Sequence, residues 1–234
     1  MSADVDRLRF RDPARARRLV RRLAELTADR ADDPVCVMHV CGTHEQAIAR
    51  FGLRSVLPPG VDLVMGPGCP VCVTDAAEID EVVALARAGV RVATYGDMIR
   101  VPGHGASLMD AKAEGARVEL VYSAPQAVEL ARAEPETPLV FFATGFETTA
   151  VTTAAILQGE LPDNFSVYSA HKYVPPAMEV VAALPDTRVQ GFLAAGHAAV
   201  ITGWGLFEPF AAAAGKPVVV AGFEPLDILA ALVR

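Results

Sequence analysis

Cysteine is scarce in this sequence, which has four cysteines in 234 residues, too few for the disulfide framework of a small secreted protein. A basic surplus is missing as well. The formal net charge is −7, whereas a protein devoted to nucleic acid carries a positive footprint. No apolar stretch approaches the roughly 20 residues of a membrane-spanning helix, and no signal peptide is recognisable. We therefore expect a cytoplasmic protein with reduced thiols that binds neither nucleic acid nor membrane.

Short apolar runs rich in β-branched residues recur along the chain, and stretches with helical periodicity separate them. Their starts lie about 25 residues apart, which leaves room for one helix in each connection. The runs are continuous rather than alternating, as expected for parallel strands covered on both faces. The predicted strands are Val35–Val40, Val61–Met65, Val90–Thr94, Val118–Tyr122, Leu139–Ala143, Ser166–Ser169, Gly191–Ala195 and Pro217–Ala221.

Eight strand–helix units fit two α/β architectures. One is a single β/α barrel, whose typical length is about 250 residues. The other is a pair of Rossmann-like, doubly wound parallel sheets flanking a cleft. In that case the chain would divide near residue 125, into an α/β domain 1–125 and a second α/β domain 126–234. The periodicity alone does not choose between them.

Several helix starts carry recognisable signals. Thr43 with Gln46 three residues later predicts a capping box. Asp75 and Ser123 stand before two further helical patterns. Near the N-terminus, a leucine stripe beginning at Leu19 predicts a solvated amphipathic helix. The last predicted helix, Leu226–Val233, carries an apolar face that we expect to be uncovered, so self-association is possible.

Cys41 lies in Cys41-Gly42-Thr43-His44-Glu45, directly after a predicted strand and before a predicted helix. A helix N-terminus favours thiolate over thiol, and a thiolate is a good metal ligand and nucleophile. His44 could add an imidazole on the same side, so Cys41 and His44 are candidate metal ligands. The alternative is that Cys41 is a small buried residue and His44 a surface residue of the helix.

Cys69 and Cys72 form a C-x-x-C motif with a proline inside, again after a predicted strand. The motif suits a redox-active dithiol, in which case Cys69 and Cys72 are catalytic, or half of a zinc site that Cys41 and His44 could complete. Cys36 lies within a predicted strand between apolar neighbours, and we expect it in the core.

The fifth and seventh strands are followed by further candidate residues. Thr148 and Thr149 at a helix start could hydrogen-bond an anion, although simple capping is an equal alternative. In parallel sheets His197 would lie on the same rim as the cysteines. The candidate cofactor-binding residues are Gly145, Glu147, Thr148, Thr149 and His197.

Taken together, these motifs resemble the HypD family of hydrogenase maturation factors. The resemblance runs from about residue 35 to the end and implies two Rossmann-like domains. It also implies a scaffold with redox-active thiols rather than a turnover enzyme, on which the Fe(CN)₂CO centre of [NiFe]-hydrogenase is assembled. The matching stretches are Cys41–Glu45, Gly66–Cys72, Tyr95–Gly103, Gly145–Thr149, His171–Met178 and Gly222–Leu229.

The resemblance also implies residue roles and partners. Cys41 matches the cysteine that binds iron, with His44 nearby, together with a cysteine of the small chaperone HypC. Cys69 and Cys72 match the redox-active pair, and a HypE-like protein would donate cyanide.

The chain departs from the family pattern at its C-terminal end. Family members usually continue into a region whose cysteines hold a [4Fe–4S] cluster, and we expect this region and its cluster to be missing here. His104 and Ala198-Ala199 also depart from the usual family residues. A thiol–disulfide oxidoreductase and a zinc-stabilised binding domain remain alternative functions.

Overall fold

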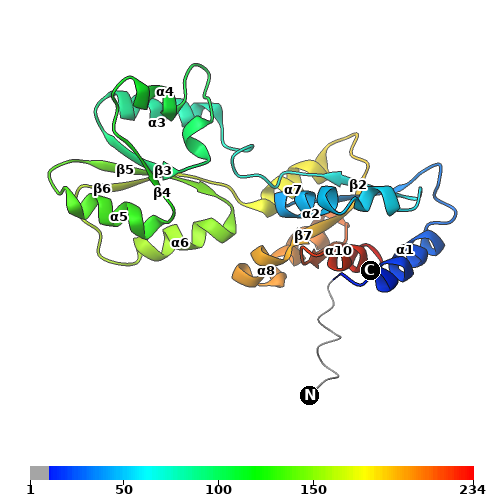
Figure 1. Ribbon diagram of the computed structural model, residues 1–234. Coiled ribbons are helices and arrows are strands. Elements are labelled where there is room, and N and C mark those ends of the chain that lie inside the picture. The colour runs from blue at the N-terminus through cyan, green and yellow to red at the C-terminus, as the bar shows by residue number, and fades with distance from the viewer. Residues whose placement is uncertain (1–10) are drawn as a thin grey trace. The chain divides into compact units, whose positions relative to one another are not determined.

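The computed structural model of the chain describes residues 11–234, which form two compact units (Figure 1). Unit 1 combines the described residues up to Gly68 with Val174–Arg234, and unit 2 is Cys69–Tyr173. Each unit contains one parallel sheet of four strands with helices packed against it. The fold is therefore α/β with two separate open sheets, as predicted, and the single-barrel alternative is wrong.

Every predicted strand forms, with bounds that differ from the expected ones by at most two residues. Unit 1 holds β1 (Val35–His39), β2 (Val61–Met65), β7 (Val189–Ala195) and β8 (Val218–Ala221). Unit 2 holds β3 (Arg91–Tyr95), β4 (Val118–Val121), β5 (Leu139–Gly145) and β6 (Phe165–His171).

Helices occupy the connections between the strands. In unit 1 they are α1 (Pro13–Leu26), α2 (Gly42–Arg50), α7 (Val174–Ala183), α8 (Gly196–Thr202), α9 (Glu208–Ala214) and α10 (Pro225–Leu232), with the 3-10 helices η2 (Leu53–Val56) and η4 (Trp204–Phe207). In unit 2 they are α3 (Ala76–Arg87), α4 (Leu108–Ala113), α5 (Ala124–Ala133) and α6 (Glu147–Leu157), with η3 (Met98–Arg100). Among the described residues no helix is long and apolar enough to cross a membrane.

The two sheets have the same strand order. The order is β2-β1-β7-β8 in unit 1 and β4-β3-β5-β6 in unit 2. Counted along the chain within each unit, both read second, first, third, fourth. All of unit 2 lies in the chain between the second and third strands of unit 1. The units therefore do not follow the split expected near residue 125, because β1 pairs with β7 and unit 2 lies between them in the chain. The spacing of strands along the sequence does not indicate which strands pair.

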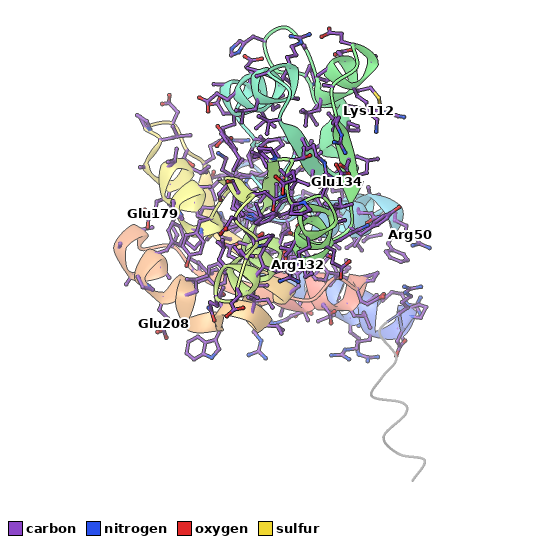
Figure 2. All side chains as sticks on the ribbon, turned by 90° about the vertical axis from the view of Figure 1, so that its left-hand side faces the viewer. Arg50, Lys112, Arg132, Glu134, Glu179 and Glu208 are labelled. Atoms are coloured by element: carbon purple, nitrogen blue, oxygen red, sulfur yellow. A yellow bond between two sulfur atoms is a disulfide. The ribbon has the colours of Figure 1, made fainter. Side chains whose placement is uncertain are left out.

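Both faces of the unit 2 sheet are covered. α3 and α4 pack on one face around Val82 and Phe142, and α5 and α6 pack on the other around Phe141 (Figure 1). The fully buried Arg91 at the start of β3 donates to Glu119 at 2.7 and 2.9 Å. Glu134, labelled in Figure 2, lies 3.5 Å from the same guanidinium. This charged cluster lies at the end of the sheet where β3 begins, which is opposite to the carboxyl ends of the strands.

In unit 1 the first and last described helices pack together. The amphipathic pattern predicted near Leu19 forms α1, and its apolar side faces α10 in a core containing Leu23, Ile228 and Leu229. The expectation that the final helix leaves its apolar face uncovered is therefore wrong. Ile228 and Leu229 are fully buried, so α1 removes the face on which the predicted association depended.

The helix caps bear out two of the three sequence signals. Asp75 caps α3 and forms a capping box with Glu78, and Ser123 occupies the N-cap of α5. The capping box predicted at Thr43 is wrong, because Cys41 is the N-cap of α2, two residues before Thr43, and the helix begins at Gly42.

Candidate functional site

Cys41 stands at the carboxyl end of the β1 region and caps α2 without a side-chain hydrogen bond to the backbone. It is a free cysteine, 6% exposed. The chain at Gly68 passes so close that a Cβ there would lie 2.5 Å from the Cys41 nitrogen and 2.6 Å from its Cα. Gly42 N–H donates to the Gly68 carbonyl at 3.0 Å. The loop around Cys41 is thus held by backbone contacts that only glycine at 68 permits.

The imidazole beside the Cys41 sulfur belongs to His197. The Cys41 Sγ lies 3.8 Å from His197 Nε2. His197 is in the first turn of α8, which follows β7, and β7 is the neighbour of β1 in the sheet. The carboxyl ends of adjacent parallel strands meet at one edge, which is where open α/β sheets bind ligands. Ala195 and Ala198 complete an apolar wall around the thiol.

The imidazole of His44 is not the one beside the Cys41 sulfur. Its ring is fully buried, and Nε2 lies 3.0 Å from the Gly222 carbonyl and 3.3 Å from that of Ala221, so Nε2–H donates to the backbone. Burial lowers the pKa of His44, which keeps the ring neutral. The rings of His44 and His197 each lie 4.8 Å from the ring of Phe223, which stands between them. His44 therefore holds the turn that carries Phe223.

A second buried histidine, His39 in β1, was not singled out from the sequence. Its Nε2 lies 2.8 Å from Glu45 Oε2, and Arg54 binds both oxygens of that carboxylate at 2.7 Å. The Arg54 hydrogen bonds are the largest cause that lowers the pKa of Glu45 to about 2. Burial lowers the pKa of His39. A histidine inside an apolar strand, six residues before a glutamate, was the available signal.

Cys69 and Cys72 are joined by a disulfide, and their Cα atoms lie 5.3 Å apart. The loop is a tight turn in which Cys72 N–H donates to the Cys69 carbonyl at 3.1 Å and the Thr74 hydroxyl donates to the Pro70 carbonyl at 2.9 Å. Cys36 is buried in β1 as expected, and burial raises the pKa of its thiol.

The Gly145–Thr149 segment connects β5 to α6 in unit 2. Gly145 has φ +138°, and a Cβ there would lie 2.4 Å from Cβ of Thr149. Thr148 and Thr149 line a pocket of about 410 Å³, whereas Glu147 is buried. His171 lies 3.0 Å from the Thr153 hydroxyl through Nε2. Of the candidate cofactor-binding residues, His197 is in the other unit, beside Cys41.

Within residues 11–234, no group of three or more histidine, cysteine, aspartate or glutamate side chains is arranged to hold a metal ion. Cys41 and His197 by themselves amount to an incomplete ligand set. The pairing of Cys69 with Cys72 leaves neither thiol available as a ligand in this state.

Comparisons with known proteins agree with the motifs. The HypD family model, described as "Hydrogenase formation hypA family", matches residues 14–234. The chain is 44% identical over 227 residues to the hydrogenase maturation factor HypD of Rhodobacter capsulatus, covering 94% of this chain and 60% of that protein. It is 41% identical over 237 residues to the HypD of Escherichia coli strain K12, covering 97% and 64% respectively.

The matches cover nearly all of this chain but only part of each relative. The chain spans about three fifths of the length of the curated relatives it matches. The family model covers nearly the whole chain and includes the Cys41 loop, the Cys69–Cys72 loop and the Gly145–Thr149 segment. The chain therefore belongs to the HypD family.

Proposed function

We propose that this chain acts in hydrogenase maturation as a scaffold on which an iron centre with cyanide and carbon monoxide ligands is assembled. The observation that carries the proposal is the incomplete ligand set at Cys41. A single free thiol stands at a helix N-terminus beside one imidazole, and no third metal-ligating side chain joins them among the described residues. Such a site suits cargo that is shared with a partner rather than a resident metal.

In this proposal Cys41 binds the iron through its thiolate, and His197 lies close enough to take up or return the thiol proton. Thiolate is the form that ligates metal, so the proton must leave when iron binds. His44 cannot supply Nε2 to the metal while this N–H donates to the backbone. Its role is to hold Phe223 against His197, which orients the imidazole toward the sulfur.

The Cys69–Cys72 pair is proposed to be redox-active. Opening the disulfide takes up two electrons and two protons and yields two thiols, and closing it returns them. The turn around Pro70, to whose carbonyl the Thr74 hydroxyl donates, holds the two Cα atoms 5.3 Å apart, within the range that a disulfide requires. The pair would supply electrons to the iron centre during assembly.

Partners would complete the centre. A HypC-like chaperone would contribute a second thiolate to iron at Cys41, and a HypE-like protein would donate cyanide. Two thiolates from two chains would supply the ligands that the single thiol of this chain lacks.

The disulfide also supports a second candidate function, a thiol–disulfide oxidoreductase that acts without iron. That function depends on Cys69 and Cys72 and is indifferent to Cys41. The iron role therefore predicts loss of function when Cys41 is substituted, whereas the oxidoreductase predicts no effect.

The test is infrared spectroscopy on the chain co-purified with a HypC-like partner under exclusion of oxygen. We expect cyanide and carbon monoxide bands that Cys41→Ala abolishes. Cys36→Ala is the matched control, because Cys36 is also a buried free cysteine of unit 1 but lies within β1, and it should keep the bands. Bands of full intensity in Cys41→Ala would refute the iron role. Disulfide exchange without any bands would favour the oxidoreductase.

A further inference from the structure

Unit 1 carries an apolar groove of about 790 Å³ along α1, the helix that packs beside α10 (Figure 1). The residues of α1 that line the groove are Pro13, Ala16, Arg17, Val20, Arg21 and Ala24. They recur every three or four residues, so they share one face of the helix. From the first to the last of them α1 rises about 16 Å. The groove is therefore elongated, and it fits a helix or a chain segment better than a compact molecule.

The rest of the groove lining is mostly apolar. Leu53 of η2 and Leu226 and Leu229 of α10 are its most buried members, each at most 4% exposed. Phe51, the C-cap of α2, and Val56, the end of η2, are 36% and 47% exposed. Removing apolar surface of this kind from water favours association. A partner that covers Phe51 and Val56 would therefore gain binding free energy.

Arginines border this apolar surface. Arg17 and Arg21 line the groove one helical turn apart, and within residues 11–234 neither side chain makes a hydrogen bond or an ion pair. Arg11 also lines the groove, but Glu224 binds its guanidinium at 2.7 and 2.9 Å. Asp12, the one acidic lining residue in the described part of the chain, accepts hydrogen bonds from the first turn of α1. The groove thus offers two free positive charges to a partner.

These charges do not stabilise the helix that carries them. α1 has five arginines and one glutamate, in a chain whose net charge is −7. Arg17 and Arg21, like Arg18 and Arg22, stand four residues apart, a spacing at which like charges destabilise a helix. The first turn of α1 holds no acidic residue to complement the helix dipole. The pattern costs helix stability, which favours a role of the arginines in recognition over a role in folding.

Neither a second copy of this chain nor a membrane matches the groove well. Among the described helices only α3 has more than one acidic residue. Its three carboxylates already contact His104, Lys172 and Tyr168, and its apolar face is buried in the unit 2 core. A helix that binds a lipid surface buries its apolar face in the lipid, whereas α1 packs that face against α10. The combination of groove and charge therefore indicates a different protein.

We propose that this groove is a docking site for an acidic amphipathic helix of a protein partner. Apolar side chains spaced one helical turn apart enter the groove and cover Phe51 and Val56. Carboxylates with the same spacing pair with Arg17 and Arg21. The groove lies at the C-terminal end of α2, whereas Cys41 caps the N-terminus of that helix, about 13 Å away along its axis. The docked helix does not depend on the role proposed for Cys41.

The test is fluorescence anisotropy of the whole chain with a labelled helical peptide of about 12 residues, the length that spans the groove. The peptide carries leucines one turn apart and glutamates beside them, and a second peptide replaces each glutamate by glutamine. We expect saturable binding of the glutamate peptide at micromolar concentration. The glutamine peptide should bind about fivefold more weakly, the loss expected for two exposed ion pairs, and added salt should reduce the difference.

The chain offers a matched pair of double variants. Arg17→Gln combined with Arg21→Gln should weaken binding of the glutamate peptide about fivefold. Arg18→Gln combined with Arg22→Gln is the control, because these exposed arginines have the same spacing on the same helix but lie outside the groove lining. The control should bind within about twofold of the parent, since screening weakens distant charges. Equal losses in the two double variants would contradict docking in the groove.

Val56→Asp tests the apolar part of the groove without a change in the buried core, because Val56 is half exposed. It should weaken binding of the glutamate peptide about tenfold, through lost apolar contact and added repulsion. Val180→Asp, on α7 of the same unit and 66% exposed, is the control and should bind as the parent does. Absence of saturable binding, or unchanged binding in Val56→Asp, would overturn the proposal. So would tighter binding of phosphatidylserine vesicles or of a short DNA duplex than of the peptide.

Discussion

Unit 1 and unit 2 have the same strand order but different side chains at the equivalent strand ends. After its first strand, unit 1 has Cys41, and after its third strand it has His197 at the start of α8. At the same two points unit 2 has Tyr95-Gly96-Asp97 and the Gly145–Thr149 segment. One topology therefore positions a buried thiol beside an imidazole in one unit and a pocket rich in hydroxyls in the other.

The comparison separates what the sheet supplies from what the side chains supply. The sheet brings the ends of the first and third strands together in both units, since these strands are neighbours. The chemistry depends on which residues follow. Around Cys41 the Nε2 atoms of His39 and His44 contact Glu45 and backbone carbonyls, while the Nδ1 atoms of both rings are buried without a hydrogen-bond partner among the described residues. At the corresponding strand ends of unit 2, Thr144, Thr148 and Thr149 line a pocket.

The largest effect is expected from Leu23→Ala, which tests whether the two units unfold separately. Leu23 is 2% exposed in the core shared by α1 and α10, so truncation should lower the free energy of unfolding of unit 1 by about 2–5 kcal/mol. Leu26→Ala is the control, because Leu26 ends the same helix and is 46% exposed. In Leu23→Ala, unit 1 should unfold at a lower urea concentration than in the parent, and the midpoint for unit 2 should be unchanged. Equal destabilisation of both units would mean that they unfold as one.

Gly68→Ala tests whether the close backbone approach at the Cys41 loop contributes to stability and to iron binding. The new methyl group would lie within 2.8 Å of three backbone atoms of Cys41, so the loop must shift. We expect a loss of about 1–3 kcal/mol in unfolding free energy together with reduced iron retention. Gly96→Ala serves as the control, since no described atom lies within 4 Å of the position that its methyl group would take in unit 2. Unchanged stability and metal content in Gly68→Ala would show that the close approach is unimportant.

Two N-caps of unit 2, Asp75 of α3 and Ser123 of α5, should differ in their contributions to stability. The Asp75 side chain accepts from Ala77 N–H at 2.9 Å, while Ser123 makes no side-chain cap bond. Asp75→Ala should cost about 1 kcal/mol and Ser123→Ala far less. Thermal unfolding of the two variants measures the difference, and equal losses would contradict it.

Tyr168 should titrate late because its hydroxyl donates to Glu81 at 2.5 Å, which raises its pKa to about 12. A raised pKa in the folded state means that the stabilisation is present below the ordinary tyrosine pKa of about 10 and is lost as pH rises toward 12. Ultraviolet titration should therefore reveal a tyrosine with a pKa of about 12 among the four. Burial also raises the pKa of Tyr95, but Glu81 is not a cause of that shift. Glu81→Gln should lower the pKa of Tyr168, whereas Glu129→Gln, on α5 of the same unit, should not. A Tyr168 pKa that stays at about 12 in Glu81→Gln would rule out this pairing as the cause.

The sequence by itself determined the eight strands, the α/β class and the positions of the reactive cysteines at strand ends, because strand periodicity, caps such as Asp75 and turn residues are local signals. The motifs around Cys41 and Cys69 also sufficed to indicate the family. These properties depend on residues close together in the chain.

Only the tertiary structure decided which residues meet. His44, three residues from Cys41, turns to the Gly222 carbonyl, and the imidazole at the sulfur is His197, separated from Cys41 by 156 residues. The pairing of β1 with β7 also divided the chain differently from its even spacing. Strand pairing and helix packing join distant segments, and the free energy that selects them comes from burial across the whole unit. No local pattern records that selection.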